Sequence, residues 1–198
     1  MVEFEKGLRQ RLLKPLTQML PIYIHIPKTG GQYLKKQLVK NNIIISKAVH
    51  TPAKLVREMV GEQYRKRFTF AMVRNPYERF LSACRFNGVE DIEGLSESIL
   101  KGKRLEVKHR EHFFTQKHFV TDDKGIIVNY IGKYEKFEEF VQELNKNKID
   151  LTRTHITKPN KSSNWEFILT EKTKRNVEEI YKEDFELFNY QIKNIKIK

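Results

Sequence analysis

The chain has 198 residues, of which 39% are hydrophobic and 11% aromatic, so it can form a core and is neither disordered nor fibrous. Its 38 Lys and Arg outnumber its 25 Asp and Glu, and the net charge of +13 favours an anionic ligand or partner. The single cysteine, Cys84, excludes an intramolecular disulfide framework and a cysteine-based zinc site. With no linker or repeat, this length predicts one domain over residues 1–198.

The first half of the chain predicts strands that alternate with helices. Residues 1–20 predict a short helical extension, and PIYIHI at 21–26 alternates in the manner of a strand. A turn, PKTGG, follows at residues 27–31. The next predicted elements are a helix at 32–40, a strand at 43–45 and a helix at 52–62.

The second half begins with FTFAMV at residues 68–73, a nearly continuous apolar run that is typical of a strand buried on both faces of a parallel sheet. The remaining predicted elements are helices at 77–85, 95–101, 136–145 and 170–181, and a strand within 126–134. Alternating strands and helices predict a three-layer α/β/α fold with a mainly parallel central sheet.

Two loops at the carboxyl ends of predicted strands carry phosphate-binding features, and such ends are where open α/β sheets bind ligands. In the first, Gly30 and Gly31 let backbone N–H groups approach an anion, the following helix adds its dipole, and Lys28 adds a full charge. The lysine precedes the glycines, so this is not the Walker A order.

The second loop follows the buried strand and begins with Arg74, and Ser82 lies two turns along the next predicted helix. A guanidinium fork and a hydroxyl suit a second phosphate. The alternative is that Arg74 and Arg79 pair with Glu78 or other nearby acids. We favour this ion pairing for Arg79 but not for Arg74.

Together the two loops, HIPKTGG and FAMVRNPYERFLSA, resemble the carbohydrate O-sulfotransferases, which use 3′-phosphoadenosine 5′-phosphosulfate (PAPS). Later stretches continue the resemblance in the family's order: EHFFTQ at 111–116, YIGKYE at 130–135, NKS at 160–162 and YKEDFELFNY at 181–190. The resemblance implies the sulfotransferase fold, which is similar to that of P-loop nucleotide hydrolases.

The resemblance also implies sites on this chain for the two ends of PAPS. The 5′-phosphosulfate is expected at Pro27, Lys28, Thr29, Gly30, Gly31, Gln32 and Tyr33. The 3′-phosphate is expected at Arg74 and Ser82, with a late loop of Asn160, Lys161 and Ser162. The family usually has Thr-Ser, whose hydroxyls help hold the 5′-phosphate, where this chain has Gln32 and Tyr33.

Sulfuryl transfer to a carbohydrate hydroxyl requires charge stabilisation at the leaving oxygen, which we assign to Lys28, and a general base. Histidine suits the base near neutral pH. His50 is favoured because related enzymes use a histidine between the two loops, and His112 is the second candidate, whereas His25 is expected to be structural. No metal is required, and no cluster of metal ligands is evident in the sequence.

Two alternatives stay open at this point: a kinase of nucleoside phosphates and a non-enzymatic basic module that binds nucleic acid. The kinase is disfavoured because this chain lacks the Walker A order. The sequence holds no nucleic-acid-binding motif, so we expect no nucleic-acid partner. A basic run, Lys101, Lys103, Arg104, Lys108 and Arg110, is either a solvated charged loop or a surface that binds an anionic carbohydrate acceptor. Without a signal peptide or apolar span, the chain is expected in the cytoplasm.

Overall fold

A computed structural model of the chain describes residues 20–31, 34, 38, 44–45, 50–149, 151 and 168–192. Apart from Leu20, the predicted N-terminal helical extension lies outside these residues. The chain forms two compact units. The first comprises residues 1–73 and 118–159, and the second comprises residues 74–117 and 160–198.

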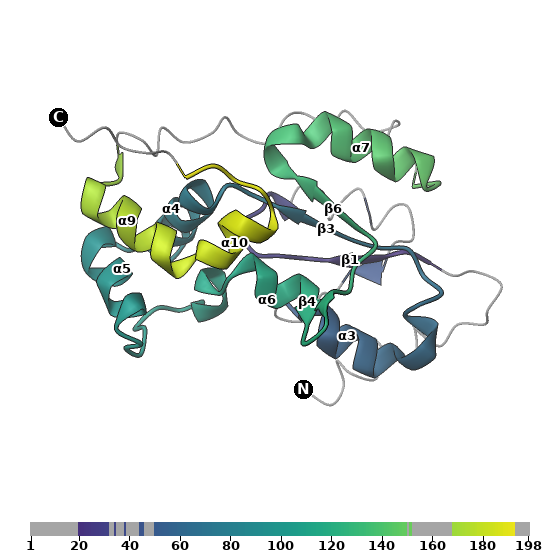
Figure 1. Cartoon of the computed structure of the whole chain (residues 1–198), viewed down its shortest axis with the longest axis horizontal. Coiled ribbons are helices and arrows are strands. Elements are labelled where there is room, and N and C mark those ends of the chain that lie inside the picture. Colours follow the sequence, from purple (N-terminus) through teal and green to yellow (C-terminus); the bar gives the residue numbers. More distant parts are fainter. Residues whose placement is uncertain are drawn as a thin grey trace. The chain divides into compact units, whose positions relative to one another are not determined.

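The first unit is built on a parallel four-stranded sheet with the strand order β2-β1-β3-β6 (Figure 1). Its strands are β1 (Ile22–Ile24), β2 (Ile44–Ile45), β3 (Thr69–Val73) and β6 (Tyr130–Lys133). In the register, Ala71 of β3 lies opposite Ile24 on one side and Ile131 on the other. All residues of β1 and β3 are buried, as their apolar sequences predict. The prediction of a parallel sheet is confirmed.

The helices of this unit lie on the two sides of its sheet, α7 on one side and α3 on the other (Figure 1). Tyr23, Phe70 and Met72 pack against Phe140 and Leu144 of α7 in a buried apolar core. The elements beyond the sheet are α3 (Ala53–Val60), a 3₁₀ turn (Gly61–Gln63), α6 (Gln116–Val120), β4 (Thr121–Asp122), β5 (Gly125–Ile126), a 3₁₀ turn (Tyr134–Lys136) and α7 (Phe137–Lys146). The first two residues of α6 belong to the second unit. The three-layer α/β/α prediction is therefore confirmed.

Some local features of the first unit differ from the prediction or go beyond it. The short antiparallel hairpin of β4 and β5 was not predicted, because four strand residues around a turn carry too little alternation. Gly31, Leu34 and Leu38 are helical, in agreement with the helix predicted at 32–40.

The second unit consists of helices around an apolar core. They are α4 (Pro76–Phe86), α5 (Ile92–Leu100), a 3₁₀ turn (Arg110–Phe113), α9 (Glu171–Ile180) and α10 (Lys182–Leu187). Phe80 and Cys84 of α4 pack in this core with Val177 and Tyr181. Cys84 is fully buried in this apolar core, as expected for a small apolar residue, and burial raises the pKa of its thiol to about 12.

Side-chain caps fix where these helices begin. The Asn75 side chain accepts a hydrogen bond from the N–H of Tyr77 at 3.0 Å, and Pro76 occupies the first turn of α4, where a missing N–H costs nothing. Thr170 caps α9 in the same way, accepting from Thr173 at 3.1 Å. Among the described residues, no helix combines the length and apolar character needed to cross a bilayer.

Candidate functional site

The loop after β1, residues 27–31, has an unusual backbone. Lys28 has φ 66° and Gly30 has φ 80°, both in the left-handed region that is uncommon for a residue with a side chain. The buried Thr29 between them donates from its hydroxyl to the carbonyl oxygen of Ile26 at 2.9 Å, which closes the loop on itself. Turns with left-handed residues can aim successive backbone N–H groups at one anion, so this shape suits a phosphate.

Both glycines of the loop lie against side chains from elsewhere in the unit, which leave no room for a Cβ. A Cβ on Gly31 would lie 2.0 Å from Nε2 of His25, and a Cβ on Gly30 would lie 2.7 Å from a ring carbon of Tyr134. No side chain fits at either position unless its neighbour moves. The loop therefore keeps bare backbone at both glycines, where N–H groups are open to the approach of an anion.

His50 lies beside this loop in the first unit. Its ring centroid is 4.7 Å from that of His25, and its Nδ1 lies 3.2 Å from the His25 carbonyl oxygen. Because a carbonyl oxygen only accepts hydrogen bonds, this contact favours the proton on Nδ1 and leaves the lone pair of a neutral ring on Nε2. His25, which is 9% exposed, lies against Gly31 of the loop and against the ring of His50, and its structural role stays a prediction.

In the second unit, Arg74 is buried and paired. Its guanidinium donates from Nε at 3.2 Å and from Nη2 at 2.9 Å to the same carboxylate oxygen of Glu78. The interpretation that Arg74 does not pair with a nearby acid was wrong, because Glu78 in the first turn of α4 lies within reach of the guanidinium of Arg74, which precedes that helix. Ser82 lies two turns further along α4 and is half-buried.

Arg79 also differs from the prediction. Its guanidinium is fully buried and donates to backbone carbonyl oxygens, that of His112 at 3.1 Å and that of Phe114, instead of pairing with Glu78. It also lies over the ring of Tyr181, 5.1 Å from the centroid. Arg79 therefore holds the 3₁₀ turn against α4 and is a structural residue.

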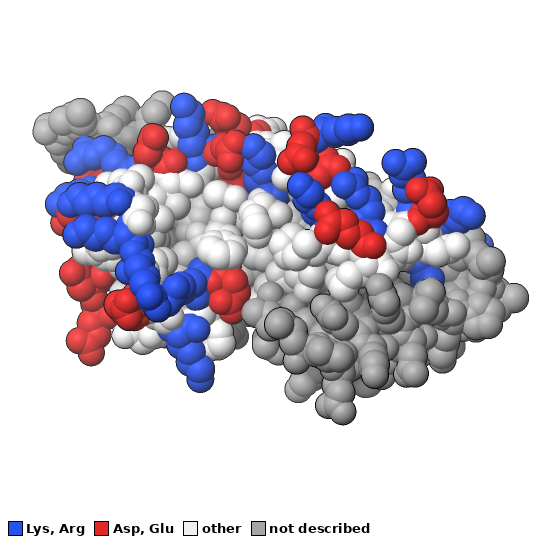
Figure 2. All heavy atoms as spheres, turned by 90° about the horizontal axis from the view of Figure 1, so that it is seen from below, with Lys and Arg blue, Asp and Glu red and all other residues white. Residues whose placement is uncertain are grey.

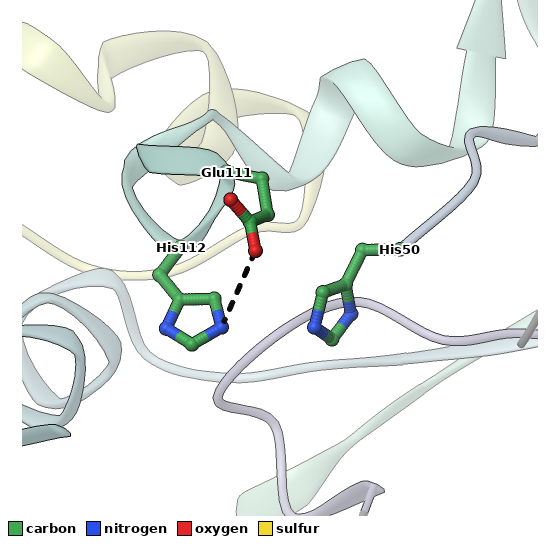
Figure 3. Close-up of side chains that lie close together, drawn as sticks. All are labelled: His50, Glu111 and His112. Carbon is green, nitrogen blue, oxygen red and sulfur yellow. Dashed lines mark ion pairs between the residues drawn. The ribbon is translucent and has the colours of Figure 1, made fainter. Parts of the chain in front are cut away.

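The 3₁₀ turn carries His112, the second candidate base, which is 5% exposed. Its Nε2 lies 4.0 Å from Oε1 of Glu111 (Figure 3), and Nδ1 of His109 lies 3.1 Å from the same oxygen. The rings of His109 and His112 stack at 5.0 Å, and the ring of Phe86 lies 4.9 Å from that of His112. A carboxylate beside an imidazole can orient the ring and stabilise its protonated form.

Five of the predicted contact residues fall where the structure describes no atoms. These are Gln32 and Tyr33 of the first loop and Asn160, Lys161 and Ser162 of the late loop. Their assignments stay predictions.

Two buried polar residues beside Arg74 were not predicted as part of the site. Gln116 hydrogen-bonds the main chain of Arg74, and Asp184 hydrogen-bonds the main chain of Gln116. Both lie inside stretches that resemble the family, at 111–116 and 181–190, and this was the signal that could have found them.

Comparisons with known proteins identify the family. The model of the sulfotransferase family matches residues 21–191, which includes both loops and the later stretches. No curated protein matches the sequence. Because the match covers most of the chain, this protein belongs to the sulfotransferase family.

Proposed function

We propose that this sulfotransferase moves the sulfuryl group of PAPS to a hydroxyl group of a carbohydrate. Family membership supports sulfuryl transfer, and the donor and acceptor are our assignments. The observation that carries the proposal is the loop at 27–31, where Lys28 stands on a left-handed backbone beside two glycines that admit no side chain. Such a loop offers backbone N–H groups and an ammonium to an anionic group.

Each end of the donor has its own residues in this proposal. The first loop, from Pro27 to Tyr33, binds the 5′-phosphosulfate, whereas Arg74 and Ser82, with the late loop at 160–162, bind the 3′-phosphate. The ion pair with Glu78 is compatible with this role, because a guanidinium has five N–H donors and can serve a carboxylate and a phosphate together. The donor supplies an activated sulfuryl group, and the protein supplies position and charge.

Lys28 stabilises the charge that develops on the leaving phosphate oxygen. As the bond forms between the acceptor oxygen and sulfur, the bond between sulfur and the phosphate oxygen breaks, and its electron pair stays on that oxygen. The ammonium of Lys28 stabilises the transition state more than the bound donor, since the oxygen is more negative in the transition state.

A histidine takes the proton of the acceptor hydroxyl. His50 is the first candidate, because its hydrogen bond to the His25 carbonyl leaves Nε2 able to accept a proton. His112 is the second, because Glu111 lies beside it and would stabilise the imidazolium that forms.

The acceptor in this proposal is an anionic carbohydrate. The five residues of the basic run between 101 and 110 are all exposed, and two of them pair with glutamates, Lys101 with Glu97 at 3.4 Å and Arg104 with Glu106 at 3.8 Å. Exposed pairs of this kind are weak and can exchange for an anionic ligand. Figure 2 shows Lys and Arg side chains gathered at the left of the view.

The test is ligand binding by the purified protein. A ligand that binds only the folded state raises the melting temperature, so adenosine 3′,5′-bisphosphate is compared with AMP, ATP and an oligonucleotide. We expect the bisphosphate to give the largest rise, and sulfuryl transfer from PAPS to an oligosaccharide confirms the activity. Equal stabilisation by AMP and the bisphosphate would contradict a site for the 3′-phosphate. A larger rise with ATP or the oligonucleotide would favour the kinase or the nucleic-acid module.

A substitution ties the binding to Arg74. Arg74→Ala should weaken binding of the bisphosphate by roughly 10- to 150-fold, the loss expected for a charge-assisted contact, and leave AMP binding unchanged. Arg85→Ala is the matched control, because Arg85 is an exposed arginine in the last turn of the same helix. Calorimetry with each ligand measures both effects.

A further inference from the structure

The main chain of Arg74 forms two hydrogen bonds with the side chain of a residue 42 positions further along the chain. Gln116 accepts a hydrogen bond from the Arg74 N–H at Oε1, 2.8 Å, and donates from Nε2 to the Arg74 carbonyl oxygen, 2.9 Å. The last ladder pair of β3 is at Val73, so the next peptide groups have no strand partner from the ladder. The Gln116 amide takes the place of one, with a donor and an acceptor arranged like a peptide group.

Gln116 is itself held by Asp184. The two oxygens of this carboxylate accept from consecutive N–H groups, that of Gln116 at 2.7 Å and that of Lys117 at 2.8 Å. Gln116 and Asp184 are both fully buried. A buried group that loses its hydrogen bond has no water to replace the partner, so breaking these bonds is costly. The arrangement therefore fixes the start of α6 and the position from which the glutamine side chain extends.

The guanidinium of Arg74 is held separately, by Glu78. Main chain and side chain are thus restrained from different segments, the main chain by Gln116 and the side chain by α4. An arginine in solution loses much rotamer freedom when it binds a ligand, and restraint before binding removes that cost.

We propose that Gln116 is a positioning residue that orients Arg74 for the 3′-phosphate of the donor, and that Asp184 acts through Gln116. This rests on the proposed function, since it requires Arg74 to bind that phosphate. A purely structural glutamine would affect folding and leave the discrimination between ligands alone. A positioning glutamine affects the ratio of the affinities for two ligands that differ only in the 3′-phosphate.

The experiment measures dissociation constants for adenosine 3′,5′-bisphosphate and AMP by calorimetry. In Gln116→Met, which keeps the length of the side chain and removes both hydrogen bonds, we expect the bisphosphate to bind about 3- to 10-fold more weakly and AMP to bind as before. Asp184→Asn keeps one acceptor oxygen and should give a smaller change in the same direction. It also serves as the second variant if Gln116→Met does not fold.

Ser96→Ala is the matched control. Ser96 is fully buried in the same unit, donates to the carbonyl oxygen of Glu93 at 2.7 Å and accepts from Asn176 at 2.8 Å. Its loss should lower the melting temperature without changing the ratio of the two affinities. A folded Gln116→Met or Asp184→Asn protein with the wild-type ratio overturns the inference.

Arg74→Ala distinguishes a failure of the positioning role from a failure of the proposed function. If Arg74→Ala removes the preference for the bisphosphate and the Gln116 and Asp184 variants keep it, the proposed function stands and the positioning role is wrong. If Arg74→Ala also keeps the preference, the 3′-phosphate site is wrong, and the positioning role fails with it.

Discussion

The two candidate donor-binding regions are built in opposite ways. The loop at 27–31 takes its shape from residues next to one another in the chain, through left-handed backbone at Lys28 and Gly30 and the contact from Thr29 to Ile26. The main chain of Arg74 takes its position from residues far along the chain, Gln116 at 42 positions and, through it, Asp184, and its guanidinium is held by Glu78. The first region depends on backbone conformation, whereas the second depends on a buried polar network.

This difference decides how each region should respond to substitution. A backbone-built loop does not depend on remote hydrogen bonds, but it tolerates no added Cβ at its two glycines, because the rings of His25 and Tyr134 lie against them. A network-built site is sensitive to the loss of a single hydrogen bond, whether its partner is near or far along the chain, since each buried group needs its partner.

The largest expected effect tests the loop. We expect Lys28→Ala to lower kcat by about 10²- to 10³-fold, because the ammonium acts mainly on charge that appears in the transition state. The affinity for adenosine 3′,5′-bisphosphate should fall much less. Steady-state kinetics with PAPS and calorimetry with the bisphosphate measure the two quantities. Lys66→Ala, an exposed lysine of the same unit, is the control. A fall in affinity with kcat unchanged would show that Lys28 does not act on the leaving oxygen.

The next prediction concerns the contact between Gly31 and His25. Gly31→Ala should lower the free energy of unfolding by about 1–3 kcal/mol, because the new Cβ would lie 2.0 Å from Nε2 of His25 and the ring must move. In a His25→Ala background the same change should be neutral or stabilising, since Gly31 is helical and alanine is the better helix former.

Chemical denaturation of the wild type, the Gly31→Ala and His25→Ala variants and the double variant measures the coupling between Gly31 and His25. Equal costs of Gly31→Ala in both backgrounds would mean that the imidazole is not what excludes a side chain from the loop.

The contrast between the regions also explains what sequence reasoning could and could not predict. The loop and the buried strand at 68–73 were found because their signals are local: glycines beside a lysine, and a continuous apolar run. The pairing of Arg74 with Glu78 was misjudged, although the spacing of four residues was visible. Gln116 and Asp184 received no role, because no local pattern tells which remote peptide group a buried side chain will bind.

The basic run gives a smaller effect, on the acceptor and not on the donor. If the exposed residues between 101 and 110 bind an anionic carbohydrate, the acceptor KM should rise with ionic strength, because exposed charges are screened over ~8–10 Å. Lys103→Glu with Arg104→Glu should raise it further and leave bisphosphate affinity unchanged. Kinetics at several salt concentrations measure this. A neutral oligosaccharide used equally well, without a salt effect, would remove the substrate role of this run.

The matched control for that charge reversal lies in the first unit. Arg65 and Lys66 are adjacent and exposed, so Arg65→Glu with Lys66→Glu changes the net charge by the same amount. If this pair raises the acceptor KM as much as the reversal at Lys103 and Arg104, the effect comes from the overall field of the protein and not from the run.

The smallest expected effect is a pH dependence in the network around Arg74. Burial raises the pKa of Asp184 above its ordinary value of 3.8, and Arg79 and the amide N–H groups of Gln116 and Lys117 offset part of this rise. Between the ordinary and the raised pKa the folded protein holds a proton that the unfolded chain has released. The free energy of unfolding therefore falls as pH rises through this window, and is flat above it. Asp184→Asn removes the titrating group, so the stability of the wild type relative to this variant should decrease from about pH 4 upward. Urea denaturation of both proteins at matched pH values measures the difference. A constant difference would mean that folding leaves the pKa of Asp184 unchanged, and a difference that rises with pH would mean that folding lowers it; either contradicts the prediction.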